Sequence, residues 1–272
     1  VPANPVEWLL TSWHYGSGCL GFSPAPEQKP RQSIQPIALT TLNQQFVQAM
    51  DNFDTETDVA IRSIMQQGSS LGGARPKTVV MHDGVECIIK FNRKNDVFDV
   101  SAAEYASMRL AFAAGIAVPD FELVKIGDQS AFVVQRFDRT PNGGRLHYIS
   151  AHSLLNTGQL ADHQAAYKTH FSYGGIAEIM RSFNPQAVAD AQQLYRRMVF
   201  NILIGNVDDH LRNHGFVSAG QGDALRLSPA FDMVPHLDAN WMPQSIGVGA
   251  HGAASTLDAD PTVGLVCAKC VT

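Results

Sequence analysis

The segment Asn206-Val-Asp-Asp-His-Leu-Arg-Asn213 is the most informative part of the sequence, because it places several acidic and amide side chains in a short loop behind an amphipathic helix. Apolar residues before it recur with the i, i+3, i+4 and i+7 spacing of a helix that buries one face. They are Ala191, Leu194, Tyr195, Met198, Val199, Ile202 and Leu203. Gly205 then predicts the end of the helix, since glycine tolerates left-handed backbone geometry.

Two short apolar runs follow the loop, at 215–217 and 224–227. The segment Gly220-Gln-Gly-Asp223 separates them, which predicts a β-hairpin. Ser228-Pro-Ala-Phe-Asp232 comes directly after this hairpin. A helix, a polar loop, a hairpin and a further aspartate, in this order, are typical of the C-terminal lobe of a phosphotransferase.

The residue types in these segments suit phosphoryl transfer. That reaction needs a group that orients the acceptor hydroxyl and takes its proton, and metal ions on the phosphate oxygens. Asp208 would serve as the base, and Asn213 and Asp232 offer the oxygen ligands that Mg²⁺ prefers. The spacing D-x-x-x-x-N arises often by chance, but the hairpin and the second aspartate make the combination specific.

Composition describes an ordinary globular protein of 272 residues with 45% hydrophobic content. The net charge of −5 excludes a general basic surface for nucleic acid. No apolar run approaches the roughly 18 residues of a membrane span. No signal peptide is visible, and the four cysteines are few and irregularly spaced. We therefore predict a cytoplasmic protein without membrane partners.

A glycine-rich segment, residues 68–77, follows one or two helices predicted over 37–67. It matches neither the Walker A pattern nor G-x-G-x-x-G. Glycines let backbone N–H groups approach a phosphate, so one interpretation is a loop that covers a nucleotide. The other is a helix-to-strand turn that uses glycine for positive φ.

Asp83-Gly84 predicts a hairpin that joins strands at 78–81 and 85–91. Lys90 ends the second strand, where it would reach nucleotide phosphates or simply face solvent. Two interpretations also remain for Glu104 in the helix predicted over 101–114. Its carboxylate would pair with Lys90, or it would close a capping box with Ser101.

A second hairpin is predicted from strands at 121–126 and 130–137, and it leads into Gln135-Arg-Phe-Asp-Arg139. An adenine would bind at such an exit, with Phe137 as the candidate for stacking; the other interpretation of Phe137 is a core residue. Residues 140–175 show a weaker pattern and are predicted as a substrate-facing insertion. Cys267 and Cys270 form a lone C-x-x-C without further ligands for zinc, so we assign no metal there.

These motifs together resemble the HipA-like serine/threonine protein kinases, the toxin halves of bacterial toxin–antitoxin pairs. The resemblance covers about residues 36–250 and rests on five motifs that occur in order. They are Gly68-Ser-Ser-Leu-Gly-Gly-Ala-Arg-Pro-Lys77, Ile88-Ile-Lys90, Gln135-Arg-Phe-Asp-Arg139, Gly205-Asn-Val-Asp-Asp-His-Leu-Arg-Asn213 and Ser228-Pro-Ala-Phe-Asp232.

The resemblance implies an α+β, two-lobed protein-kinase-like fold, with a small β-rich N-lobe and a mainly helical C-lobe. Residues 1–35 would be the remnant of an N-terminal subdomain, of which Cys19–Pro24 looks like the last strand. The N-lobe would cover 36–138 and hold the Gly-rich loop and the nucleotide lysine. A shortened C-lobe with the catalytic loop would cover 139–272. Family members are usually longer at both ends, and three explanations remain for the difference. They are a short toxin whose N-terminal piece is a separate subunit, a trimmed chain, and a degraded copy.

The resemblance also implies a set of functional residues, with ATP and Mg²⁺ as the cofactors. Asp208 would be the general base, Asn213 and Asp232 would bind metal, and Ser70 would be the site of autophosphorylation. The nucleotide would contact Gly72, Gly73, Ala74, Arg75, Pro76, Lys77, Lys90, Gln135, Arg136, Phe137, His210, Leu211, Arg212, Asn213, Phe231 and Asp232.

The implied activity is phosphorylation of a translation-related protein, such as an aminoacyl-tRNA synthetase. The expected partner is a HipB-like helix-turn-helix antitoxin, through which the kinase would meet DNA only indirectly. Three alternatives remain. They are a pseudokinase that binds an antitoxin or a nucleotide, a small-molecule kinase, and a metal-dependent hydrolase built on Asp208, Asp209, His210 and Asp232.

Overall fold

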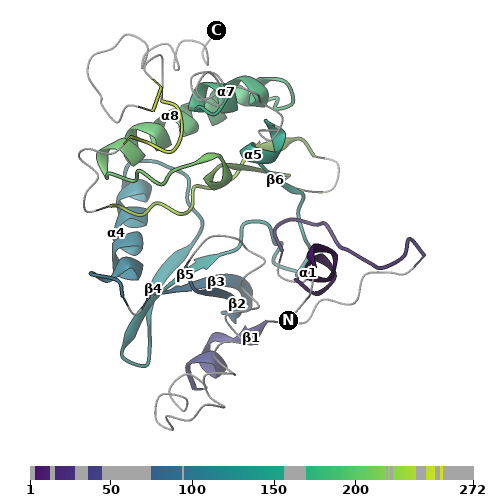
Figure 1. The fold of residues 1–272 in the computed structure, drawn as a ribbon, viewed down its shortest axis with the longest axis vertical. Coiled ribbons are helices and arrows are strands. Elements are labelled where there is room, and N and C mark those ends of the chain that lie inside the picture. The colour runs from purple at the N-terminus through teal and green to yellow at the C-terminus, as the bar shows by residue number, and fades with distance from the viewer. Residues whose placement is uncertain are drawn as a thin grey trace. The chain divides into compact units, whose positions relative to one another are not determined.

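A computed structural model gives the structure of residues 4–12, 16–27, 36–44, 75–93, 95–155, 170–218, 220, 223–236, 243–248 and 252–253. The chain divides into two compact units (Figure 1). The first comprises residues 1–105 and 120–145, and the second comprises 106–119 and 146–272. Helix α4 (Val100–Ala113) therefore begins in the first unit and ends in the second.

The first unit is built on a five-stranded sheet with the order β1-β2-β3-β5-β4. The strands are β1 (Ile37–Ala38), β2 (Lys77–His82), β3 (Val85–Phe91), β4 (Phe121–Ile126) and β5 (Gln129–Gln135). Both predicted hairpins are confirmed, because β2 pairs antiparallel with β3 and β4 with β5. Asp83 and Gly84 both have positive φ, as a tight two-residue turn between twisted strands requires.

One face of this sheet forms the hydrophobic core of the first unit. Its buried members include Val80, Cys87, Ile89, Phe91 and Val133, with Leu39 and Leu42 packed onto them. Burial raises the pKa of the Cys87 thiol to about 12, and neighbouring carboxylates add to the shift. The thiol therefore stays protonated and belongs to the core.

The N-terminal residues differ from the prediction. Helix α1 (Pro5–Ser12) was not expected. The predicted strand at Cys19–Pro24 is wrong, because these residues adopt no regular secondary structure. The preceding backbone at Gly16–Gly18 is instead held by side chains of the first unit. Helices predicted over 37–67 lie mostly outside the described residues.

The second unit packs helices against a small sheet with the order β6-β7-β8 (Figure 1). Its elements are β6 (Tyr148–Ser150), α5 (Ala151–Leu154), α7 (Tyr173–Arg181), α8 (Ala187–Leu203), the 3-10 helix η4 (Leu211–Asn213), β7 (Gly215–Ser218) and β8 (Leu225–Leu227). The predicted hairpin is confirmed as the antiparallel pair β7–β8, and Gly205 ends α8 with a φ of 68°.

Strand β6 corrects the expectation for residues 140–175. Part of that segment is no insertion, because Tyr148–Ser150 pairs antiparallel with β7. Gly215 on β7 is a sequence signal for this pairing. A Cβ atom at that position would collide with the Tyr148 ring, so the close approach requires glycine.

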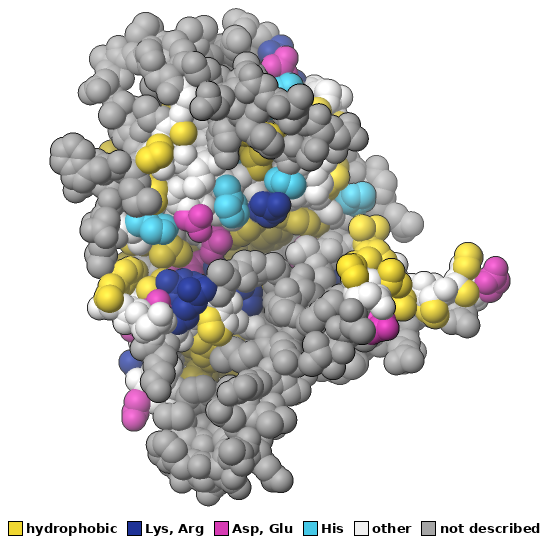
Figure 2. Space-filling model, in the orientation of Figure 1, with side chains coloured by type: hydrophobic (Ala, Val, Ile, Leu, Met, Phe, Trp, Pro, Cys, Tyr) yellow, Lys and Arg dark blue, Asp and Glu magenta, His cyan; other side chains and the backbone are white. Residues whose placement is uncertain are grey.

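The described part of the face in Figure 2 is mixed in charge. Figure 2 shows acidic, basic and histidine side chains interspersed on the described part of one face, together with exposed hydrophobic groups. This view shows no large area of a single sign, in line with the net charge of −5. None of the helices formed by the described residues is long and apolar enough to cross a membrane.

Candidate functional site

Two adjacent aspartates after α8 have opposite environments. Asp208 is exposed, and within the described part of the chain its carboxylate has no hydrogen-bonding or ionic partner. Asp209 is only 2% exposed, and two side chains contact the Oδ2 atom of its carboxylate. Burial therefore distinguishes them, and Asp208 is the one whose carboxylate is accessible to a substrate.

Asp209 is held by side chains from both sides of the loop. The Tyr173 hydroxyl on α7 donates a hydrogen bond to its Oδ2 atom. The His214 Nε2 atom lies 3.0 Å from the same oxygen. Burial raises the pKa of Tyr173 well above its usual value, and the Asp209 charge raises it further. The hydroxyl thus stays protonated and remains a donor.

Asn213 and Asp232 supply oxygen atoms in the same unit. The Asn213 side chain is buried, and its Nδ2 atom lies 3.5 Å from the Asp208 carbonyl oxygen. This orientation leaves the Asn213 Oδ1 atom for another contact. Asp232 is half-buried and has a left-handed φ of 62°, which a non-glycine residue adopts only when its surroundings hold it. Amide and carboxylate oxygens of this kind suit Mg²⁺.

The other residues of this unit that were predicted to contact the nucleotide differ in their burial. Leu211 packs into the hydrophobic core, and Arg212 is exposed. The His210 carbonyl accepts from the Asn213 N–H at 2.8 Å and so forms the turn of η4. Phe231 is half-buried beside Asp232. Among the described residues, no group of three His, Cys, Asp or Glu side chains could hold a metal ion, so the hydrolase ligand set is not assembled.

Lys90 lies inside the first unit rather than at its surface. The residue is 8% exposed, and its Nζ atom lies 2.6 Å from Glu104 Oε1 on α4. The same atom stands 5.9 Å from the centre of the Phe132 ring on β5. The solvent-facing interpretation of Lys90 is therefore wrong.

The alternative role of Glu104 as a helix cap is also wrong. Helix α4 begins one residue earlier than predicted, at Val100. Asp99 caps it, because its Oδ1 atom accepts from the Ala102 N–H at 3.0 Å. The Ser101 N–H is taken by the Asn92 side chain at 2.8 Å. The Glu104 carboxylate therefore accepts from Lys90 and does not cap the helix.

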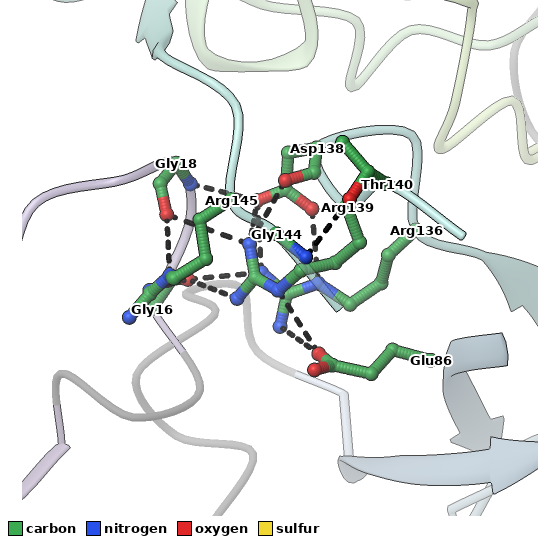
Figure 3. A network of polar contacts seen from close by, with 9 residues as sticks. All are labelled: Gly16, Gly18, Glu86, Arg136, Asp138, Arg139, Thr140, Gly144 and Arg145. Carbon is green, nitrogen blue, oxygen red and sulfur yellow. Dashed lines mark hydrogen bonds and ion pairs between the residues drawn. The ribbon is translucent and has the colours of Figure 1, made fainter. Parts of the chain in front are cut away.

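The exit of β5 is fixed by a buried polar network (Figure 3). The Arg136 guanidinium donates to both carboxylate oxygens of Asp138, at 2.9 and 2.8 Å, and to the Gly16 carbonyl at 2.9 Å. Arg139 donates to Glu86 at 3.0 Å and to Asp138 at 3.0 Å. The Arg136 side chain is committed to this network, so Arg136 would contact a nucleotide through its backbone only.

The same network anchors the N-terminal segment. Arg145 donates to the carbonyls of Gly16 and Gly18, at 2.9 and 2.8 Å. The Gly18 N–H donates to Asp138 at 2.7 Å. Burial lowers the pKa of Arg145 to about 10, and the charges of Arg139 and Arg136 lower it further. Arg145 therefore remains protonated at neutral pH. The positive charges of this network are stabilised by its carboxylates and backbone carbonyls.

The other predicted nucleotide contacts lie at the start of β2 and the end of β5. Arg75 forms an ion pair with Asp96 at 2.7 Å, and Lys77 pairs with Lys90 across the sheet. The Pro76 carbonyl accepts from the Phe91 N–H at 3.0 Å. Gln135 and Phe137 are half-buried. The predicted contacts Gly72, Gly73 and Ala74 and the predicted autophosphorylation site Ser70 lie outside the described residues.

Sequence reasoning missed the buried residues that support the loops. They are Tyr173, Arg197, Asn201 and His214 in the second unit and Asp138 and Arg139 in the first, together with the half-buried Glu86 and Arg145. One signal was present in the sequence. Arg197 and Asn201 lie one turn apart on a helix whose neighbouring positions are core residues.

The family model described as the HipA-like C-terminal domain matches residues 69–266, which is most of the chain. The chain therefore belongs to the HipA-like kinase family. The HipA of Shewanella oneidensis MR-1, solved with HipB and operator DNA, is similar in structure, with a TM-score of 0.66 and 20% identity over 94% of this chain and 63% of that one. That likeness shows the fold, which is α+β and HipA-like; the division into kinase lobes stays a prediction.

Two curated relatives agree with this family. The Shewanella oneidensis protein named "Serine/threonine-protein kinase toxin HipA" is 24% identical over 80% of this chain and 53% of its own length. A Haemophilus influenzae protein named "Putative kinase" is 27% identical over 67% of this chain and 57% of its own length. The chain thus spans about half the length of these relatives.

The Lys90–Glu104 pair leads to a prediction on stability. Glu104→Leu should lower the free energy of unfolding by about 3–5 kcal/mol, because it leaves the Lys90 ammonium buried without its carboxylate. Adding Lys90→Met should restore most of the loss, since both buried charges are then gone. Urea unfolding followed by circular dichroism measures both free energies.

Asp96→Asn, in the more exposed ion pair with Arg75, is the control and should lower the free energy of unfolding by about 1 kcal/mol or less. Equal losses in the single and double variants would contradict the interpretation.

Asp138 leads to a prediction on pH dependence. Burial raises its pKa, but hydrogen bonds and charges from Arg136 and Arg139 outweigh burial and hold the pKa below the usual value. The ionised carboxylate therefore stabilises the fold above about pH 4, and this contribution is lost as the pH falls through the folded pKa. Asp138→Asn should be less stable at pH 7 and lose less stability between pH 7 and pH 3. The urea midpoint measures this stability at each pH, and profiles that run parallel for the variant and the wild type would refute the interpretation. Asp128→Asn, in an exposed turn, is the control and should keep the wild-type profile.

Proposed function

We propose that the chain is an ATP- and Mg²⁺-dependent serine/threonine protein kinase of the HipA toxin type. One observation carries the proposal: the Asp208 carboxylate is exposed and uncommitted among the described residues, while its neighbour Asp209 is buried and fixed. A base must be accessible to a hydroxyl and must be held rigidly, and this pair meets both needs.

Each residue would have a distinct task. Asp208 would orient the serine or threonine hydroxyl of the substrate and accept its proton as the oxygen attacks the terminal phosphorus. Asn213 and Asp232 would hold Mg²⁺, which when bound neutralises charge on the phosphate oxygens. Lys90, oriented by Glu104 at 2.6 Å, would bind phosphate oxygens, and Gln135–Phe137 would meet the adenine.

The substrate and the partner are proposed from the relatives. The name of the Shewanella toxin supports a serine or threonine acceptor, and the family resemblance supports a translation-related protein such as an aminoacyl-tRNA synthetase. Autophosphorylation would occur at Ser70. The structure of HipA with HipB and operator DNA supports a helix-turn-helix antitoxin as partner, with DNA bound through it.

Radiolabelled ATP tests the catalytic role of Asp208. With Mg²⁺, the wild type should transfer label to itself or to a protein substrate, and Asp208→Ala should reduce the rate about 10²- to 10⁴-fold, the usual contribution of a general base. Asp223→Ala removes another exposed carboxylate of the same unit and should label at the wild-type rate.

Nucleotide binding separates this function from its alternatives. Calorimetry should show weaker ATP binding by Lys90→Met than by wild type, since the phosphates lose a cation. Bound ATP without label in the wild type would indicate a pseudokinase. Equal labelling by Asp208→Ala and wild type would refute the role of Asp208.

A further inference from the structure

Two buried polar side chains stand one turn apart on α8. Arg197 and Asn201 are 2% and 1% exposed, and Leu194 and Met198 beside them belong to the core. Polar groups at such positions destabilise a fold unless hydrogen bonds compensate. Their partners therefore indicate why the helix carries them.

Both side chains reach the two loops that hold the proposed catalytic and metal-binding residues. The Arg197 Nη2 atom donates to the Ser228 carbonyl at 2.6 Å, at the start of the segment that leads to Asp232. The Asn201 Oδ1 atom accepts from Asn206 Nδ2 at 3.1 Å, at the start of the Asp208 loop. Helix α8 is thus the common support of both loops.

Asn206 connects the two loops directly. It is 2% exposed, and its Nδ2 atom donates to Asn201 Oδ1 and also lies 3.4 Å from the Asp232 carbonyl oxygen. One side-chain amide therefore joins the helix, the first residues of the Asp208 loop and the backbone of Asp232. Its backbone N–H donates in addition to the Asn201 carbonyl at 2.8 Å.

The direction of the hydrogen bonds along this chain of groups is consistent. The Asn201 Nδ2 atom donates to the Tyr173 oxygen at 3.3 Å, and the Tyr173 hydroxyl donates to Asp209. Asn201 must then present its oxygen to Asn206, so Asn206 must present its nitrogen. The nitrogen is the atom that the Asp232 carbonyl requires. A carboxylate in place of the Asn206 amide would face two acceptors.

We propose that Asn206 is a positioning residue that fixes Asp232 relative to the Asp208 loop, with its amide oriented by Asn201. Neither asparagine needs to touch the reacting atoms. The inference rests on the proposed function, since that function gives Asp208 and Asp232 their tasks. The left-handed φ of Asp232 adds weight, because this backbone state relies on outside contacts.

The test compares Asn206→Ala and the near-isosteric Asn206→Asp with the wild type. Label transfer from ATP should slow about 10- to 100-fold in both, since small displacements of reacting groups have effects of this size. The KM for ATP should change less than the rate, because the variants leave the nucleotide contacts proposed in the first unit intact. The Mg²⁺ concentration at half-maximal rate should rise, since Asp232 is displaced.

Asn184→Ala is the matched control. Asn184 is also buried, and its Nδ2 atom donates to Asp190 at 2.6 Å, but neither residue belongs to the two loops. This variant should lose stability yet keep the wild-type rate and Mg²⁺ requirement. Double-variant analysis adds a second check: Asn201→Ala combined with Asn206→Ala should be little slower than Asn206→Ala alone, because the two amides act as one unit.

Hydrogen exchange gives a readout that does not depend on activity. Backbone amides at 206–213 and 228–236 should exchange faster in both Asn206 variants than in the wild type and in Asn184→Ala. If the wild type is active and the Asn206 variants transfer label within about twofold of its rate, the positioning role is overturned and the kinase function stays intact. An inactive wild type would overturn the kinase function. In that case, hydrogen exchange around Asp232 that is the same in the Asn206 variants and the wild type would separately overturn the positioning role.

Discussion

The buried carboxylate of Asp209 is the constraint on which the candidate site depends. It accepts from Tyr173, lies 3.0 Å from His214 Nε2, and is only 2% exposed. A polar group buried this deeply destabilises the fold unless its hydrogen-bond partners are in place. Because the loop is held at Asp209, the preceding residue Asp208 points its functional group to solvent without needing a contact of its own.

A similar division between support and function occurs in the first unit. Lys90 is held by Glu104, and the exit of β5 is held by arginines that bind Asp138, Glu86 and the carbonyls of Gly16 and Gly18 (Figure 3). In both units, charged side chains that look functional in the sequence are occupied in holding loops. Among the described residues, the Asp208 carboxylate is exposed and has no such task.

Local sequence patterns predicted the elements whose signals are local. The turn at Asp83-Gly84, the end of α8 at Gly205 and the β7–β8 hairpin follow from residues adjacent in the chain. The sequence could not decide whether Glu104 caps its helix or pairs with Lys90, because that depends on a helix start one residue earlier and on a strand 14 positions away. Strand β6 and the Gly16–Gly18 anchor were missed for the same reason, since both are contacts between distant segments.

A crystal structure with Mg²⁺ and a non-hydrolysable ATP analogue would test the proposed roles of Asp208, Asn213 and Asp232. Mg²⁺ should lie about 2.0–2.1 Å from Asn213 Oδ1 and from an Asp232 carboxylate oxygen. The Asp208 carboxylate should face the terminal phosphate, with Asp209 still bound to Tyr173. A metal ion coordinated elsewhere, or an Asp208 side chain turned away from that phosphate, would contradict these roles.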